Sequence, residues 1–200
     1  MSQLPFSQSC ENNKAPILDV IKTVFSQSTH VLEIGTGSAQ HAVYFAKHLP
    51  HLTWQTSDQE AYLEGIERRL AQTRLPNLKA PLALDVTKAW PLAKSNAVDA
   101  IFTANTLHIM SKEAVEAFFN GIGEHLVTRG QLCIYGPFNY GGEYSCESNA
   151  SFDIWLKERD HRSAIRDIEW IQALAVNHDL TLTADLPMPA NNRLLHLTKI

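Results

Sequence analysis

The sequence predicts an α/β fold with a doubly wound, mostly parallel sheet that ends in an antiparallel hairpin. Short apolar segments alternate with helical segments up to about residue 135, a pattern typical of parallel strands joined by crossover helices. A glycine-rich turn follows the first apolar segment, and two strand-like segments near the end of the chain flank a Pro-Met-Pro turn. A sheet of this kind places its ligand crevice at the carboxyl ends of the parallel strands.

The first half of the chain supplies alternating helices and strands. A helix is predicted to open at Lys14, with Pro16 in its first turn and apolar residues along one face. The segments that follow are a strand at residues 30–34, a helix over 42–46 that ends near Pro50, a strand at 52–56, a helix over 63–70 and a strand at 80–86.

The second half continues the alternation and then becomes rich in loops. The predicted segments are a strand at 98–104, a helix over 115–122, a strand at 131–135, a helix at 149–159, a helix that Asp167 caps, and strands at 180–184 and 194–199. A chain of 200 residues has the size of one ordinary domain, and we expect residues 1–200 to form a single domain.

Composition and charge exclude several classes of protein. The chain is 44% apolar and 19% charged, as in globular proteins, and no apolar run approaches the ~18 residues of a membrane span. A net charge of −4 argues against a long nucleic acid as partner. Three cysteines without CxxC spacing, and an amino terminus without the features of a secretory signal, favour the cytoplasm. No pattern favours one oligomeric state.

The glycine-rich turn predicts a cofactor site at the end of the first strand. Gly35 and Gly37 let the backbone turn and approach a ligand without a Cβ in the way. A dinucleotide site would need a third glycine where the chain has Gln40. Glu33 instead suits a ligand with an ammonium or sulfonium centre, such as S-adenosylmethionine. A purely structural turn is the alternative interpretation.

Two acidic residues extend this site. Asp58 follows the second strand, where a carboxylate can accept both ribose hydroxyls, and Asp85 ends the third strand, where it can accept an adenine amino group. Each could instead cap a helix or a turn. The residues that we expect to contact the cofactor are Glu33, Gly35, Thr36, Gly37, His41, Asp58, Gln59, Asp85, Val86 and Asn105.

The order of these residues resembles that in class I S-adenosylmethionine-dependent methyltransferases. More closely, nearly the whole chain resembles the uncharacterised methyltransferase-like family that includes vertebrate methyltransferase-like protein twenty-six. This second resemblance rests on residues 11–18, 37–42, 82–86, 105–109, 135–138, 148–153, 165–167 and 188–192. It implies a seven-stranded sheet, S-adenosylmethionine as cofactor with S-adenosylhomocysteine as product, and an undefined methyl acceptor. The chain departs from many class I enzymes at Ala39, where they carry a third glycine.

Methyl transfer requires donor and acceptor to be held in line, and it requires a base only where the acceptor must lose a proton. His108, after the fourth strand, and Tyr135, on the fifth, are the candidate catalytic residues. His108 could instead be a structural residue of the crevice wall. The segment around Asn105 differs from the Asn-Pro-Pro-Tyr type of sequence, which disfavours methylation of nucleobases.

We expect the acceptor pocket to be formed by Asn13, Lys14, Phe138, Asn139, Tyr140, Arg166, Asn191 and Asn192. Aromatic residues with a few polar partners suit a small-molecule site. Three alternatives stay open. Arg166 could form a structural ion pair with Asp160 or Asp167, residues 12–14 could cap the first helix instead of covering the cofactor, and residues 191–192 could serve only as a turn.

Three functions compete on these residues. The leading prediction is an enzyme that methylates a small molecule, with a protein side chain as the alternative acceptor. A non-catalytic module that binds S-adenosylmethionine or S-adenosylhomocysteine would have the same cofactor site. An NAD-dependent oxidoreductase is disfavoured by Gln40 and by the lack of a Tyr-x-x-x-Lys pair. His41, His48 and His51 do not complete a recognisable ligand set, so we expect no metal.

Overall fold

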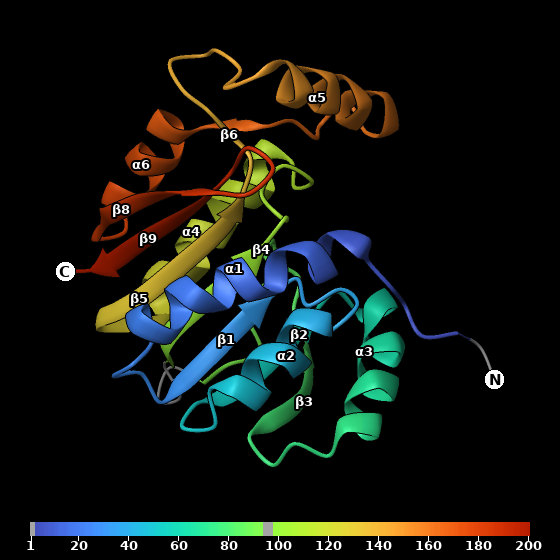
Figure 1. Cartoon of the computed structure of the whole chain (residues 1–200). Coiled ribbons are helices and arrows are strands. Elements are labelled where there is room, and N and C mark those ends of the chain that lie inside the picture. The colour runs from blue at the N-terminus through green and yellow to red at the C-terminus, as the bar shows by residue number, and fades with distance from the viewer. Residues whose placement is uncertain (1–2, 94–97) are drawn as a thin grey trace.

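The computed structural model describes residues 3–93 and 98–200 and contains a seven-stranded sheet of order β3-β2-β1-β4-β5-β9-β8 (Figure 1). Its strands are β1 (His30–Ile34), β2 (Thr53–Asp58), β3 (Leu78–Ala83), β4 (Val98–Ala104), β5 (Leu126–Gly136), β8 (Leu180–Met188) and β9 (Asn192–Lys199). Strands β1 to β5 run parallel to their neighbours, and β9 is antiparallel to both β5 and β8. The predicted doubly wound sheet with its C-terminal hairpin is confirmed.

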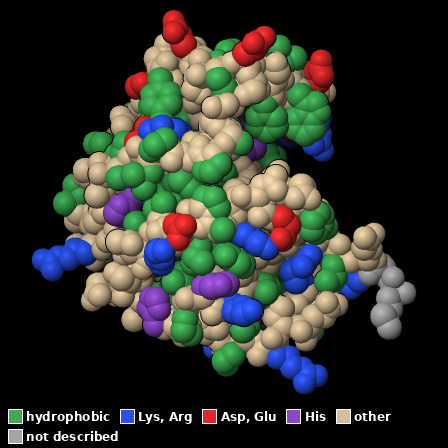
Figure 2. Space-filling view, in the orientation of Figure 1, with side chains coloured by type: hydrophobic (Ala, Val, Ile, Leu, Met, Phe, Trp, Pro, Cys, Tyr) green, Lys and Arg blue, Asp and Glu red, His purple; other side chains and the backbone are tan. Residues whose placement is uncertain are grey.

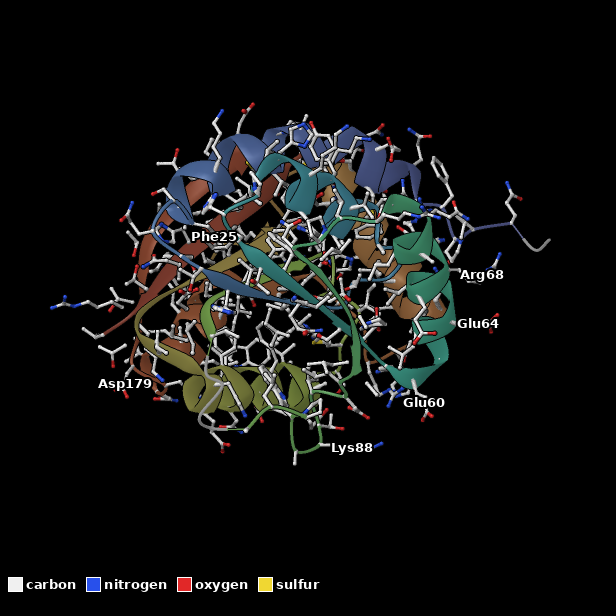
Figure 3. The ribbon with its side chains drawn as sticks, turned by 90° about the horizontal axis from the view of Figure 1, so that it is seen from below. Phe25, Glu60, Glu64, Arg68, Lys88 and Asp179 are labelled. Atoms are coloured by element: carbon white, nitrogen blue, oxygen red, sulfur yellow. The ribbon has the colours of Figure 1, made fainter. Side chains whose placement is uncertain are left out.

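Helices cover both faces of the sheet. They are α1 (Gln8–Val24), α2 (Gln40–His48), α3 (Glu60–Thr73), α4 (Lys112–His125), α5 (Glu147–Arg159) and α6 (Ile168–Val176). Apolar side chains of α1, α2 and α3 form one core on one face, and those of α4 and α6 form a second core on the other. Figure 3 shows α1 and α2 opposite α4 across the sheet, with Glu64 and Arg68 of α3 pointing outwards.

Helix α5 belongs to neither of these layers. It lies beyond the carboxyl ends of the strands, close to the two-residue strands β6 (Phe138–Asn139) and β7 (Arg166–Asp167), which pair in parallel (Figure 1). The sequence does not predict this small second sheet. In the described part of the chain, no helix is both long and apolar enough to cross a membrane.

Helix α1 begins earlier than predicted. Ser7 is its N-cap, and the Ser7 hydroxyl accepts a hydrogen bond from the backbone of Cys10 at 3.4 Å. Pro16 therefore lies in the middle of the helix instead of its first turn, where its missing N–H leaves one carbonyl of the preceding turn without a helical partner. Asn13 and Lys14 lie within the helix, so the interpretation of residues 12–14 as its cap is wrong.

Three other boundaries differ from the prediction. Strand β3 ends at Ala83 and not at residue 86, because the chain turns at Asp85. Strand β5 begins at Leu126 and passes through a polar stretch that has no strand periodicity. Strand β8 runs through Pro187, which an edge strand tolerates, and the hairpin turns at residues 189–191, two of which have positive φ.

Candidate functional site

A cavity of about 1290 Å³ opens at the carboxyl ends of β1, β2, β4 and β5. Figure 2 shows a hollow between the upper part of the molecule, which carries α5, and the main body below. The strand ends contribute Gly35 after β1, Asp58 of β2, Asn105 after β4 and Tyr135 of β5. Helices α1 and α5 supply two further walls, and the loops after β3 and β4 complete the lining together with the β8–β9 turn. This is the edge at which doubly wound sheets bind ligands.

The glycine turn is held against β2 and β4. The backbone N–H groups of Gly35 and Thr36 both donate to the carbonyl oxygen of Ser57, at 3.1 and 3.0 Å. Gly35 has φ +74°, and a Cβ at this position would lie 2.5 Å from Cγ2 of Thr106. Ala39, which stands where many class I enzymes have a third glycine, is fully buried and also has a positive φ, +58°.

Asp58 connects β2 to the glycine turn. One carboxylate oxygen accepts the backbone N–H of Gly37 and the other accepts that of Gln59, both at 2.7 Å. Burial raises the pKa of Asp58, and these two hydrogen bonds oppose the increase. The carboxylate is therefore fixed in direction at the floor of the cavity.

Asp85 lies two residues beyond β3 and forms a turn. Its Oδ1 accepts hydrogen bonds from the backbone N–H and the hydroxyl of Thr87, at 3.0 and 2.7 Å, and its Oδ2 lies 3.4 Å from Nζ of Lys88. These bonds lower the pKa of Asp85. Asp85 also lines the cavity together with Val86, so the turn and the site use the same residue.

Glu33 lies one residue below the cavity wall, which begins on β1 at Ile34. It is 2% exposed, and its Oε2 accepts hydrogen bonds from the Trp54 indole at 3.0 Å and the Thr36 hydroxyl at 3.2 Å. Burial raises the pKa of Glu33 to about 8. Through Thr36, the side chain supports the glycine turn from beneath. Its direct contact with a cofactor stays a prediction.

A buried polar cluster joins α1 to the site. Nε2 of His41 lies 2.6 Å from Oδ1 of Asn13, and Asn13 also hydrogen-bonds with Tyr135. Burial lowers the pKa of His41 to about 4, so the ring is neutral at pH 7 and donates its Nε2–H to Asn13. The ring stacks on Phe45, with 5.3 Å between centroids. All three polar side chains line the cavity, and they hold α1 over it.

The three histidines considered as metal ligands point to different partners. His48 hydrogen-bonds with the carbonyl oxygen of Tyr44 and His51 with that of Phe25, whereas His41 contacts Asn13. Among residues 3–93 and 98–200, no three His, Cys, Asp or Glu side chains gather in a metal-binding group.

His108 lies in the cavity wall and is 6% exposed. Burial lowers its pKa to about 4, and the positive charge of Arg166 contributes. Its ring meets that of Phe152 edge-on, with 5.3 Å between centroids. The backbone N–H of Ala164 donates to the carbonyl oxygen of His108 at 3.0 Å, which fixes the loop after β4.

Arg166 has a different environment from the one predicted. Its guanidinium donates to the carbonyl oxygens of Leu107, Met110 and Arg162, so the ion pair with Asp160 or Asp167 is wrong. Asp160 pairs with Arg162 instead. Arg166 lines a separate hollow of about 710 Å³ and holds the loop that carries His108.

Of the other residues predicted for the acceptor pocket, only Asn13 and Asn192 line the large cavity. Lys14 pairs with Glu11 and lies over the ring of Tyr44 on α2, and Phe138 is part of the core. Asn139 faces the smaller hollow, the Tyr140 hydroxyl donates to Asp185, and Asn191 bonds to Ser148. Phe138 and Tyr140 turn back towards the sheet, and this removes both side chains from the cavity.

Helix α5 supplies the wall that sequence reasoning missed. Its cavity-facing residues are Ser148, Asn149, Phe152, Trp155, Leu156 and Arg159. Their spacing of three and four residues defines one helix face. The helix itself is predicted, but its polar and apolar residues do not separate clearly in the sequence, so periodicity does not identify the face.

Comparisons with known proteins agree with this fold. A family model described as "protein of unknown function (DUF938)" matches residues 4–199. Among solved structures, an O-methyltransferase family 2 protein from Planctomyces limnophilus, in complex with apigenin, has a TM-score of 0.80 at 17% identity. The match covers 94% of this chain and 57% of that one.

Two other solved structures are similar. The O-methyltransferase NcsB1 from neocarzinostatin biosynthesis, in complex with S-adenosyl-L-homocysteine and 1,4-dihydroxy-2-naphthoic acid, gives a TM-score of 0.78 at 15% identity and covers 96% of this chain and 55% of that one. Mitomycin 7-O-methyltransferase MmcR gives 0.77 at 18% identity, with 88% and 50% covered. The chain thus spans about half the length of these proteins, and it has the class I methyltransferase fold.

Proposed function

The chain belongs to the DUF938 family, and we propose that it is an S-adenosylmethionine-dependent methyltransferase that acts on a small molecule. One observation carries the proposal. The Gly35 turn and the carboxylates of Asp58 and Asp85 surround one end of a cavity that continues past Tyr135 to an aromatic wall on α5. The cavity volume of about 1290 Å³ is larger than that of a typical single-ligand pocket, which is about 300–1,000 Å³. The cavity therefore has room for a methyl donor and an acceptor.

The residues at the β1–β3 end fit this cofactor. Asp58 and Asp85 offer oxygen acceptors for ribose hydroxyls and an adenine amino group, and the glycine turn allows a close approach of the ligand to the backbone. Thr36, Gly37, His41, Gln59, Val86 and Asn105 line the same end. When bound, S-adenosylmethionine supplies a methyl group that its sulfonium centre has already activated. The similar fold of NcsB1, whose complex contains S-adenosyl-L-homocysteine, supports this assignment.

The chain's own contribution to the reaction is positioning. Holding the acceptor in line with the donor and excluding water can lower the activation free energy by roughly 7–11 kcal/mol. His108 is neutral at pH 7, because its pKa is about 4, and it can accept a hydrogen bond from an acceptor hydroxyl. Burial raises the pKa of Tyr135, so its phenol stays protonated and can orient the acceptor. Apigenin and dihydroxynaphthoic acid in the similar structures support an aromatic hydroxyl as the acceptor group.

Thermal unfolding with S-adenosylmethionine, S-adenosylhomocysteine and NAD, each in a separate sample, tests the cofactor. A ligand at a hundred times its Kd stabilises a protein by about 2.7 kcal/mol, or roughly 5–10 °C at this chain length. We expect the shift with both adenosyl compounds and none with NAD. Asp58→Ala should abolish the shift, whereas Asp19→Asn, a change at an exposed carboxylate of α1, should leave it intact.

Two outcomes would contradict the proposal: a shift with NAD alone, or wild-type affinity for S-adenosylmethionine in Asp58→Ala.

A second assay distinguishes an enzyme from a binding module. It follows the release of S-adenosylhomocysteine in the presence of hydroxylated aromatic compounds. Under the proposal, Tyr135→Phe lowers turnover and leaves cofactor binding intact. Cofactor binding without methyl transfer to any of these compounds would favour the non-catalytic module. We also propose that the chain is related to the methyltransferase-like family that includes vertebrate methyltransferase-like protein twenty-six.

A further inference from the structure

The two ends of the large cavity carry charges of opposite sign. The negative charge at the β2–β3 end is that of Asp58, since Asp85 pairs with Lys88, whereas Arg159 and Arg162 lie at the α5 end with Asp160. Arg162 is committed to Asp160, with its Nε 3.1 Å from one carboxylate oxygen and a terminal nitrogen 2.9 Å from the other. The pair cancels its own charge. The α5 end therefore keeps one uncompensated positive charge, that of Arg159.

Arg159 contacts an aromatic ring and not a carboxylate. Its guanidinium carbon lies 4.6 Å from the centroid of Trp155. Within the part of the chain that the structure describes, no Asp or Glu side chain lies within ion-pair distance of it. A cation in the last turn of a helix also interacts favourably with the helix dipole, which accounts for its place at the end of α5. The helix dipole does not account for the exposed indole beneath it.

Aromatic rings form a continuous path from this cation into the cavity. Trp155 stacks on Phe152 with 5.6 Å between centroids and 20° between planes, and Phe152 meets His108 edge-on at 5.3 Å. Exposure falls along the path, from 46% at Trp155 to 6% at His108. Ile109, which is 60% exposed, lines the cavity from the loop after β4. Large apolar side chains that share an exposed mouth are typical of a ligand site.

We propose that the methyl acceptor is a planar aromatic molecule with an anionic group, an inference that rests on the proposed function. Its ring lies along Phe152 and Trp155, its anionic group reaches Arg159 at the rim, and its nucleophilic hydroxyl points towards His108. An aromatic ring can pack against the exposed parts of Trp155 and Phe152, and a carboxylate matches the planar fork of a guanidinium. The positive charge of Arg159 at this end and the carboxylate of Asp58 at the other favour an anionic acceptor here and a cationic donor there.

Three probes of matched shape test the two parts of this inference. Isothermal calorimetry on the full chain saturated with S-adenosylhomocysteine would compare 2-naphthoate, naphthalene-2-carboxamide and trans-decahydro-2-naphthoate. The carboxamide keeps the rings and removes the charge, and the decahydro compound keeps the charge and removes planarity. We expect 2-naphthoate to bind at least about threefold more tightly than either analogue.

Two variants then assign the effect to residues. Arg159→Gln should weaken 2-naphthoate by about three- to tenfold and leave the carboxamide unchanged. Trp155→Leu should weaken both aromatic probes by about fivefold and leave the decahydro compound unchanged. Arg129→Gln, at an exposed position in the first half of β5, is the matched control and should change none of the affinities.

The outcomes separate this inference from the proposed function. If neither adenosyl compound stabilises the wild-type chain, the proposed function fails. If they do stabilise it, but 2-naphthoate binds no more tightly than the carboxamide, or Arg159→Gln weakens both probes equally, the anionic acceptor is overturned and the cofactor assignment stands. Equal binding of 2-naphthoate and its decahydro analogue would overturn the planar ring.

Discussion

The two ends of the cavity are built in different ways. At the end proposed for the cofactor (the cofactor end, formed by the Gly35 turn, Asp58 and Asp85), backbone groups hold the carboxylate of Asp58 and the turn at Gly35 through hydrogen bonds of 2.7–3.1 Å. At the end proposed for the methyl acceptor (the acceptor end, formed by α5 and the loop after β4), side chains of a helix outside both layers form one wall, and Trp155 is 46% exposed. The first end suits one fixed ligand. The second can change its selectivity by substitution of a few side chains without disturbing the sheet.

One buried carboxylate of α5 connects the helix to the chain on either side of it. Asp153 is 2% exposed and accepts hydrogen bonds from the Tyr144 hydroxyl at 2.7 Å, the backbone of Ile165 at 2.6 Å and Nζ of Lys157 at 2.6 Å. Burial alone would raise the pKa of Asp153, but these bonds lower it. The acceptor end thus depends on polar contacts of α5, whereas the cofactor end depends on the sheet.

The largest effect is expected at the cofactor end, from Gly35→Ala. The new Cβ would lie 2.5 Å from Thr106, whose hydroxyl is held by Thr103 at 2.6 Å, and φ is +74°. Left-handed strain of roughly 1–2 kcal/mol and overpacking of roughly 1–3 kcal/mol give a loss of about 3 kcal/mol in the free energy of unfolding. Urea unfolding measures this loss.

Gly141→Ala is the matched control for that experiment. Gly141 has φ +59°, and no other atom lies within 4 Å of the position its Cβ would take. It should cost only the strain, about 1–2 kcal/mol. Equal losses of unfolding free energy in the two variants would show that close packing against Thr106 does not hold the glycine turn. The proposed difference in rigidity between the cofactor end and the acceptor end would then be wrong.

The positions of the glycine turn and Asp58 at one edge of the sheet could be predicted from the sequence because their determinants are local. Gly35 and Gly37 follow a strand directly, and the position of Asp58 after the next strand is fixed by the topology of a parallel sheet. Glu33 belongs to the same local pattern, but the sequence does not reveal that it lies beneath the turn. Its depth depends on Trp54, a residue of the neighbouring strand.

The acceptor end could not be predicted because its residues meet only through tertiary packing. Nothing in the sequence around Arg166 indicates that two of its three partners are carbonyl oxygens more than fifty residues away. Tyr140 suits an acceptor pocket by type, yet its hydroxyl bonds to Asp185 on β8. The sequence predicts too late a start for helix α1, because Pro16 is typical of a first turn. The actual N-cap, Ser7, lies earlier in the chain.

The second largest effect concerns the pH dependence that Glu33 confers. Its pKa is about 8 in the folded chain against an ordinary value of 4.5, so folding takes up a proton between these pH values. Because the folded state binds this proton more tightly, the contribution of Glu33 to stability is largest below pH 4.5 and decreases as the pH rises to 8. Glu33→Gln mimics the protonated acid and should remove a decrease on the order of 3 kcal/mol between pH 5 and 8.

Chemical denaturation of both proteins at several pH values measures this difference. The neutral, buried His41 and His108 act in the opposite direction, since their lowered pKa values reduce stability as the pH falls from 6.5 to 4. They are present in both proteins and cancel in the comparison. If the free energy of unfolding depends on pH in the same way in wild type and Glu33→Gln, Glu33 is ionised in the folded chain at neutral pH. The cofactor end would then contain a buried negative charge beneath the glycine turn.

The smallest effect is expected at the acceptor end, from Arg166→Lys. A lysine keeps the charge but cannot reach three carbonyl oxygens at once, so we expect a loss of about 1–2 kcal/mol in the free energy of unfolding. The pKa of His108 should stay low, because the charge remains. Arg166→Met removes the charge, and the pKa of His108 should then rise above about 4 in an NMR titration. If both variants leave that pKa unchanged, burial alone keeps His108 neutral, and Arg166 acts on the acceptor end only by fixing the loop after β4.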